Sequence, residues 1–234
     1  MRKLPSLRLP AVGALLASAT LVAASLMAAA PVTAGQGFGS HSTFGGPLSN
    51  SGNWAGYAAS GQTFTKIVGH WVEPKAVCNG SALYAPWIGI DGFNDTTVEQ
   101  TGVQTQCSGG SPRVSGWYEM YPAAPVYYSN PASIGDHFTA KVVYIGGGTY
   151  RLTLTDNTKG WSHTVQKSLR AKNASAEAII EAPGGFPGLP NGVTFTGVTV
   201  NGQKLAAFNP TKLIATGGWT PGPLNGGTFT ITHK

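Results

Sequence analysis

Carboxylates are the scarce reactive side chains of this sequence, because it contains only nine Asp and Glu in 234 residues. Five of them lie within apolar or aromatic segments, whereas Glu73 precedes Pro74 and Asp95 lies in a Gly/Asn-rich turn, where we expect solvated or turn-forming roles. A buried charge is costly unless it is paired or hydrogen-bonded. Acids set among Trp, Tyr and Ile therefore indicate a cleft, and the alternative is that each lies on the outer face of its strand. The five are Asp91, Glu99, Glu119, Glu177 and Glu181.

Strand geometry limits which of these groups can act on one atom. Glu177 and Glu181 share one face of an extended segment, about 13 Å apart at roughly 3.3 Å per residue. They cannot flank one water molecule together, so a catalytic partner must come from another strand. Trp87, Gly89 and Asp91 share a face in the same way, and we expect Gly89 to leave open space beside Trp87.

Other common catalytic and metal-binding patterns are absent from the sequence. It has no G-x-S-x-G elbow, no H-E-x-x-H and no phosphate-binding loop. The five histidines are dispersed, and His70 and His137 are interpreted as residues on strand faces. Asp95-Thr96-Thr97 resembles the Asp-Thr-Gly loop of pepsin-like peptidases, but it lacks the Gly and has no second copy. We therefore predict no metal and no cofactor.

Alternating polar and apolar residues predict the elements that position these side chains. Residues 137–144 and 150–155 alternate on either side of Gly146-Gly147-Gly148, which is typical of a β-hairpin. Asn201-Gly202 predicts a second hairpin between VTFTGVTV and KLAAF, and 228–232 is a further strand. No convincing helical periodicity follows the first 34 residues. The predicted fold is all-β, an antiparallel sandwich of two packed sheets (concanavalin-like).

The N-terminal region has the pattern of a secretory signal peptide. A basic leader and the apolar run 11–30 precede Val32-Thr33-Ala34, a small-residue cleavage site. We predict a signal peptide at 1–34, a flexible lead-in or propeptide remnant at 35–50, and one domain at 51–234. After cleavage we expect a secreted, extracellular protein that has no membrane segment. The alternative is that the apolar run is retained as a membrane anchor.

Composition and charge exclude several further classes. Charged residues are only 10% of the chain and aromatic residues another 10%, which argues against disorder. Loss of the three basic leader residues would lower the formal net charge from +6 to +3. The remaining Lys and Arg form no block along the sequence, so we predict no nucleic-acid binding. We also expect the protein to be a monomer. Cys78 and Cys107 are expected to form one disulfide in an oxidising compartment.

Five motifs and their order along the chain resemble those of the glutamic peptidase (eqolisin) family. The resemblance extends from about Ser51 to the C-terminus and agrees with the sandwich predicted above. The motifs are SGNWAGY (51–57), WIGIDG (87–92), VEQTGV (98–103), WYEMYP (117–122) and AEAIIEAP (176–183).

The resemblance implies a peptidase that uses a Gln–Glu dyad and an activated water, with no metal and no covalent intermediate. The family's glutamine matches Gln100, and its glutamate is assigned to Glu177, with Glu181 as the second choice. Trp87 and Asp91 are expected to line the substrate cleft, and Glu119 to support the dyad. Substrates would be proteins or peptides. Ala178 stands where many fungal relatives carry Trp, which we expect to remove an aromatic wall of the cleft.

Two other functions stay open on the sequence. A carbohydrate-active or carbohydrate-binding sandwich would also present carboxylates and aromatic platforms, with paired carboxyl groups about 5 Å apart in a retaining glycosidase. The second alternative is a non-catalytic relative of the peptidases. A carboxylate base that acts without histidine would favour acid operation.

Overall fold

Nearly every described segment of the chain is extended, as the alternation of polar and apolar residues predicts. The computed structural model describes residues 48–183 and 186–233, which belong to the unit Ala34–Lys234. The strands are β1 (Leu48–Gly52), β2 (Trp54–Ser60), β3 (Lys66–Val72), β4 (Leu83–Ile90), β5 (Val98–Ser108), β6 (Ser111–Tyr121), β7 (Val126–Tyr127), β8 (His137–Gly146), β9 (Thr149–Asp156), β10 (Trp161–Ser168), β11 (Ser175–Glu181), β12 (Val193–Val200), β13 (Gln203–Lys204), β14 (Thr211–Ala215), β15 (Trp219–Pro221) and β16 (Phe229–His233).

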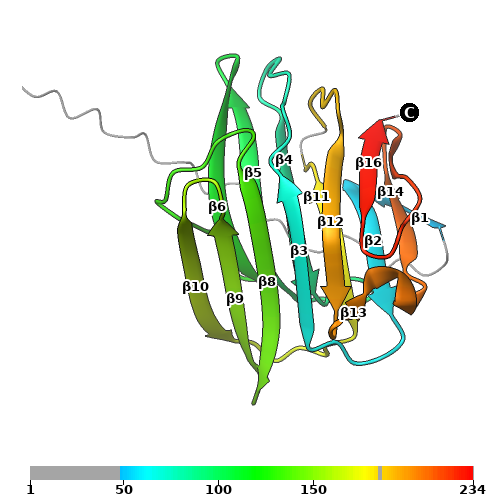
Figure 1. Ribbon diagram of the computed structural model, residues 1–234. Helices are drawn as coiled ribbons and strands as arrows, with labels where there is room; N and C mark the ends of the chain where they lie inside the picture. The colour runs from blue at the N-terminus through cyan, green and yellow to red at the C-terminus, as the bar shows by residue number, and fades with distance from the viewer. Residues whose placement is uncertain (1–47, 184–185, 234) are drawn as a thin grey trace, which may run out of the picture. The chain divides into compact units, whose positions relative to one another are not determined.

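The strands follow one hydrogen-bonded path that folds into two layers. Its order is β10-β9-β8-β3-β12-β16-β15-β14-β2-β11-β4-β5-β6-β7, with β1 beside β14 and β13 beside β12. We call β10, β9, β8, β3, β12 and β16 the front sheet and β14, β2, β11, β4, β5, β6 and β7 the rear sheet (Figure 1). Strand β5 packs on β8 and β9, and β4 packs on β3 and β8. The predicted two-layer sandwich is therefore confirmed, and all pairings are antiparallel except β1 with β14.

Side chains from the inner faces of both sheets form the main core. Ile67 and Leu152 from the front sheet and Tyr84, Ile88 and Ile180 from the rear sheet are fully buried in it. Each buried aliphatic or aromatic side chain stabilises the fold by about 1.5–3 kcal/mol. A second apolar cluster lies on the outer face of the rear sheet, and it contains Trp54, Ala58, Ala85, Trp87, Phe93, Val98, Trp117, Ile179 and Leu213.

The hairpin predictions are confirmed for β8 and β9, and only partly for the segment after Asn201-Gly202. There β13 has two residues, and the chain continues as the 3-10 helix η1 (Leu205–Phe208) instead of a strand. The predicted flexible lead-in also ends earlier than residue 50, since β1 begins at Leu48 and pairs with β14. The rest of the predicted lead-in and the predicted signal peptide lie outside the described residues.

The predicted disulfide is present. Cys78 and Cys107 are bonded and 29 residues apart in sequence, with Cα atoms 5.2 Å apart. The bond joins the segment that follows β3 to the end of β5. In the part of the chain that the structure describes, no helix is long and apolar enough to cross a membrane.

Candidate active site

Four residues form a cross-strand row on the outer face of the rear sheet. Glu177 in β11 is opposite Gly89 in β4, Gly89 is opposite Gln100 in β5, and Gln100 is opposite Glu119 in β6. The alternation predicted for β11 is confirmed, because Ile179 belongs to the outer cluster while its neighbours on either side belong to the core. Three of the predicted site residues are thus brought to one face by backbone register alone.

Gly89 does not leave open space, so that expectation is wrong. A Cβ atom at this position would lie 3.0 Å from Cζ3 of Trp87 and 3.2 Å from both Gln100 Cβ and Val98 Cγ1. The ring of Trp87 therefore fills the space above Gly89, between the strand that carries Glu177 and the strand that carries Gln100. A side chain at position 89 would therefore force the Trp87 ring or its neighbours to shift.

Gln100 is held by the glutamate opposite it. Its Nε2 donates to Glu119 Oε2 at 2.5 Å, and both side chains are buried. Burial raises the pKa of Glu119 to about 9, the charge of Glu181 adds to the rise, and the bond from Gln100 opposes it. Since a carboxylate oxygen only accepts, this contact fixes which side of the Gln100 amide carries its NH₂ group.

A second side-chain hydrogen bond joins β7 to β5 across β6. Tyr127 donates its hydroxyl to Gln104 Oε1 at 2.5 Å. Burial raises the pKa of Tyr127 to about 12, and the nearby charge of Glu119 raises it further. Tyr127 is therefore within electrostatic reach of the Glu119 carboxyl.

Glu181 lies near Glu119 and has donors of its own. Asn53 Nδ2 donates to Glu181 Oε1 at 2.9 Å. Burial raises the pKa of Glu181 to about 8, while the indole N–H groups of Trp54 and Trp87, followed by the Asn53 bond, lower it. Sequence reasoning missed Asn53, although it lies in the SGNWAGY motif and directly precedes a strand that pairs with β11.

Glu177 has a different set of neighbours, at the end of the sheet where β4 turns into β5. Burial raises the pKa of Glu177 well above its usual value; the Ser175 hydroxyl and the Phe93 backbone N–H lower it, and the charges of Asp91 and Asp95 raise it. The two glutamates of β11 thus share a face but lie in separate polar groups.

Asp91 is not on the face that carries Trp87, contrary to the prediction. Strand β4 ends at Ile90, and Asp91 has φ 64°, which turns its side chain out of the alternation. Its carboxylate accepts backbone N–H bonds from Lys172 at 3.1 Å, Asn173 at 2.7 Å and Ala174 at 2.6 Å. Asp91 therefore ties the β4–β5 loop to the segment before β11.

Two neighbouring acids complete that loop. Asp95 Oδ1 accepts the backbone N–H of Gly92 at 2.8 Å and of Thr97 at 3.3 Å, so the predicted turn-forming role is confirmed. Glu99 points to the inner face instead, and burial, followed by the charges of Asp91 and Asp95, raises its pKa to about 9. Glu99 is therefore not part of the outer-face group.

Two further expectations are corrected by burial. Glu73 is only 1% exposed, and its carboxyl accepts bonds from Thr105 Oγ1 at 2.6 Å and Trp71 Nε1 at 3.3 Å. Ala178 belongs to the core between the sheets, so a larger side chain there could not form a wall of the outer-face site. Among residues 48–183 and 186–233, no three His, Cys, Asp or Glu side chains are grouped as metal ligands would be.

The fold and this site define a β-sandwich protein in which the amide of Gln100 and the carboxyl groups of Glu119 and Glu181 lie together on the outer face of one sheet. Solved structures share the fold. Scytalido-glutamic peptidase with a peptide-based transition state analog has a TM-score of 0.68 and 23% identity, covering 80% of this chain and 100% of that one. SCP-B, an eqolisin in a complex with the tripeptide Ala-Ile-His, has a TM-score of 0.63 and 22% identity over the same shares.

Sequence comparison gives the family. The model of the Peptidase A4 family matches residues 52–215, and the chain belongs to this family. Aspergillopepsin-2 of Aspergillus niger is 29% identical over 157 residues. The aligned region is 56% of this chain and 56% of that protein, so the match spans little more than half of the relative's length.

Proposed function

We propose that this protein hydrolyses peptide bonds with a water molecule activated between Gln100 and Glu181. Membership of the Peptidase A4 family supports peptides as the substrate class. One observation carries the choice of residues: Glu119 accepts a hydrogen bond from Gln100 and is at the same time within electrostatic reach of Glu181. An amide donor and a carboxyl base from different strands therefore belong to one polar group.

Glu177, the first choice from the sequence, is less suited to this role. It lies in the same cross-strand row as Gln100, two strands away, but the ring of Trp87 lies over Gly89, the residue between them. Its polar neighbours, Ser175 and the Phe93 N–H, belong to the opposite end of the site. We therefore propose Glu181 as the base and Glu177 as a group that stabilises the β4–β5 end of the site.

The proposed reaction uses one proton transfer in each direction. The Glu181 carboxylate takes a proton from water, and the hydroxide attacks the scissile carbonyl carbon. The Gln100 amide donates its second N–H to the developing oxyanion, an interaction worth about 3–4 kcal/mol in the transition state. Protonated Glu181 then gives its proton to the leaving nitrogen as the C–N bond breaks. Glu119 is a positioning residue, since it holds the other N–H of Gln100.

We propose that the reaction runs at acid pH. Glu181 must then be ionised below neutral pH, and this requires a water molecule in contact with its carboxyl group. Burial is the largest cause that raises the pKa of Glu181 to about 8. Hydration by the reacting water removes part of that desolvation, and the donors Asn53, Trp54 and Trp87 then favour the ionised form. Glu181 has three such donors and Glu119 has one, so Glu181 ionises first.

We also propose that the protein is secreted as a monomer after cleavage near residue 34. The leader supports export, and the Cys78–Cys107 disulfide supports an oxidising compartment. We expect mass spectrometry of the protein from culture medium to show an N-terminus near Gly35. A chain found only in the cell, with its leader intact, would contradict secretion.

Digestion of an unfolded protein substrate from pH 2 to 7 tests the peptidase proposal. Wild type is expected to cleave in the presence of pepstatin and of EDTA, and Gln100→Ala is expected to lose at least about 100-fold in kcat, as removal of an oxyanion donor does. Gln100→Glu tests whether a carboxyl can replace the amide. Unchanged cleavage by Gln100→Ala would reject the proposed role of the amide, and the absence of cleavage by wild type at every pH would favour a non-catalytic relative.

A further inference from the structure

The surface of this protein carries no exposed carboxylate side chain. All nine Asp and Glu of the sequence lie within the described residues, and all nine are buried. Soluble proteins usually expose both signs of charge. The buried acids are Glu73, Asp91, Asp95, Glu99, Glu119, Asp136, Asp156, Glu177 and Glu181.

The basic residues show the opposite distribution. Eleven Lys and Arg lie in the described residues, and each is exposed or half-buried. Over the described ranges, Lys159 with Asp136 is the one ion pair. The charged side chains on the surface of the described domain are therefore almost all positive, which favours association with polyanions.

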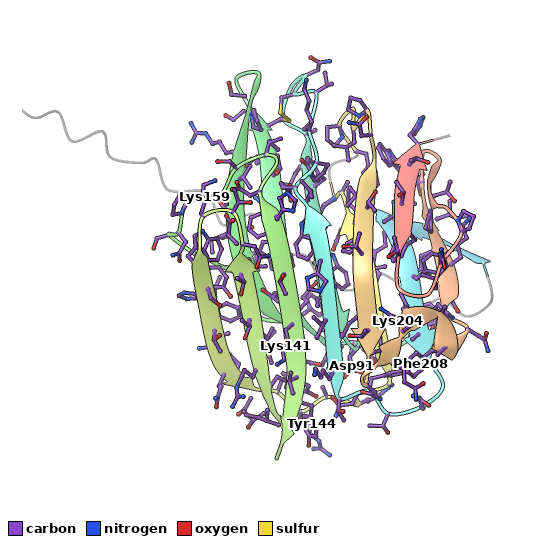
Figure 2. The ribbon with its side chains drawn as sticks, in the orientation of Figure 1. Asp91, Lys141, Tyr144, Lys159, Lys204 and Phe208 are labelled. Atoms are coloured by element: carbon purple, nitrogen blue, oxygen red, sulfur yellow. A yellow bond between two sulfur atoms is a disulfide. The ribbon has the colours of Figure 1, made fainter. Side chains whose placement is uncertain are left out.

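Four of these cations gather on the outer face of the front sheet, although they are far apart in sequence. Lys66 in β3 and Arg151 in β9 are both opposite Val143 of β8, on its two sides. Lys141 is two residues from Val143 on the same face. Lys204 lies in the cross-strand row of Lys141, which runs through Val68 of β3 and Thr199 of β12. We call Lys66, Lys141, Arg151 and Lys204 the front-face cluster; Figure 2 labels Lys141 and Lys204 on the near layer.

A groove adjoins the front-face cluster. It has a volume of about 700 Å³, and its lining combines the polar His70, His137, Lys75, Asn157 and Thr196 with apolar residues such as Val72, Pro74 and Ile134. His70 lies two residues along β3 from Val68, the partner of Lys141, so the groove and the cluster share one strand. The acid in the lining, Glu73, is 1% exposed, and burial raises its pKa to about 8, so it adds little negative charge at acid or neutral pH.

We propose that this face binds an acidic polysaccharide, with the front-face cluster on its anionic groups and the groove on its sugar hydroxyls. The neighbouring strands β9 and β10 present paired hydroxyl groups, Thr153 with Thr164 at 3.0 Å and Thr155 with Ser162 at 2.9 Å. Hydroxyl, amide and imidazole groups are donors and acceptors that match a polyol. The face is on the opposite side of the sandwich from the candidate active site, so a bound polymer would leave that site accessible.

The same face is less suited to nucleic acid or lipid. Nonspecific binding of single strands uses aromatic side chains for base stacking, and among the described residues no Trp, Tyr or Phe is fully exposed. Insertion into a membrane surface needs an amphipathic apolar element. The large exposed hydrophobic residues of the described chain are isolated: Val72, Val77, Val126 and Ile145.

Binding of the purified protein to polygalacturonate and to dextran sulfate, compared with neutral dextran, tests this proposal. We expect binding to both polyanions at low salt, weakening as salt rises, and none to neutral dextran. The triple variant Lys66→Gln, Lys141→Gln, Arg151→Gln is expected to lose on the order of 100-fold in affinity. Its matched control is Arg113→Gln, Lys172→Gln, Lys212→Gln, which removes the same charge elsewhere and is expected to lose less than about 5-fold.

The outcomes separate a binding face from net charge. An equal loss in both triple variants would overturn the proposal, because attraction would then depend on total charge alone. Absence of binding by wild type, or tighter binding of a single-stranded oligonucleotide or of anionic vesicles than of the polysaccharides, would also overturn it. Hydrolysis of a short neutral peptide should be the same in the front-face variant and wild type, which shows that the variant is folded.

Discussion

Gln100 Nε2 lies 2.5 Å from Glu119 Oε2, on adjacent strands in direct register. Residues opposite each other in an antiparallel pair are held at fixed spacing by the ladder. The orientation of the Gln100 amide therefore depends on a side chain that need not touch the substrate.

Replacement of Glu119 should lower catalysis by misplacing Gln100. We expect Glu119→Leu to reduce kcat about 10–100-fold with a smaller change in KM, the usual effect of losing a group that orients a reacting residue. Glu119→Gln keeps an acceptor oxygen and should retain more activity. A KM effect with kcat unchanged in Glu119→Leu would contradict the positioning role. Steady-state kinetics on one peptide substrate measure both variants.

Gly89→Ala should destabilise the fold and impair the site. Its Cβ would stand 3.0 Å from the Trp87 ring, and overpacking of this kind costs about 1–3 kcal/mol. Urea denaturation measures the change. Gly222→Ala is the control, because the nearest atom to its added Cβ would be Thr230 O at 3.4 Å. Equal stability of the two variants would show that the Trp87 ring moves freely.

Removal of Asn53 should shift the pH dependence of the reaction. Its hydrogen bond at 2.9 Å favours ionised Glu181. Asn53→Ala therefore raises the pKa of Glu181, and the acid limb of kcat/KM should move to higher pH by up to about 1 unit. A pH–rate profile that moves to lower pH, or stays in place, would argue against Glu181 as the base.

Stability should be greatest in acid and fall as the pH rises. Burial raises the pKa of Glu73 to about 8 and of Glu99 to about 9, above their values in the unfolded chain. The folded state then binds more protons than the unfolded state from about pH 4.5 upward, so stability is full below that pH and is lost as pH rises through 8–9. Thermal unfolding from pH 3 to 9 measures this. Glu73→Gln should flatten the decline, and a Tm that rises with pH would contradict it.

Sequence alternation predicted much of this arrangement. It correctly assigned Glu177 and Glu181 to one face of β11, and Ala178, which alternates with them, lies on the opposite face in the core. It could not distinguish Glu177 from Glu181, because both share a face and the choice depends on which neighbours surround each carboxyl. The ring of Trp87 fills the space above Gly89, and its rotamer cannot be predicted from the spacing of residues in the sequence.

Other differences arise where the chain leaves a regular strand. Asp91 adopts a positive φ, so alternation no longer fixes its direction. Glu73 is buried by long-range contacts with Thr105 and Trp71. The front-face cluster joins residues 66 to 204, and only the strand order brings them together.

The two glutamates of β11 provide the most direct test of the proposed base. Glu181→Gln and Glu177→Gln are isosteric changes on one face of one strand, and their kcat values can be compared at the pH optimum of wild type. We expect Glu181→Gln to lose at least about 1,000-fold, as removal of a catalytic base does, and Glu177→Gln to lose less than about 10-fold. The reverse order, in folded variants with the same urea midpoint, would contradict the assignment of Glu181.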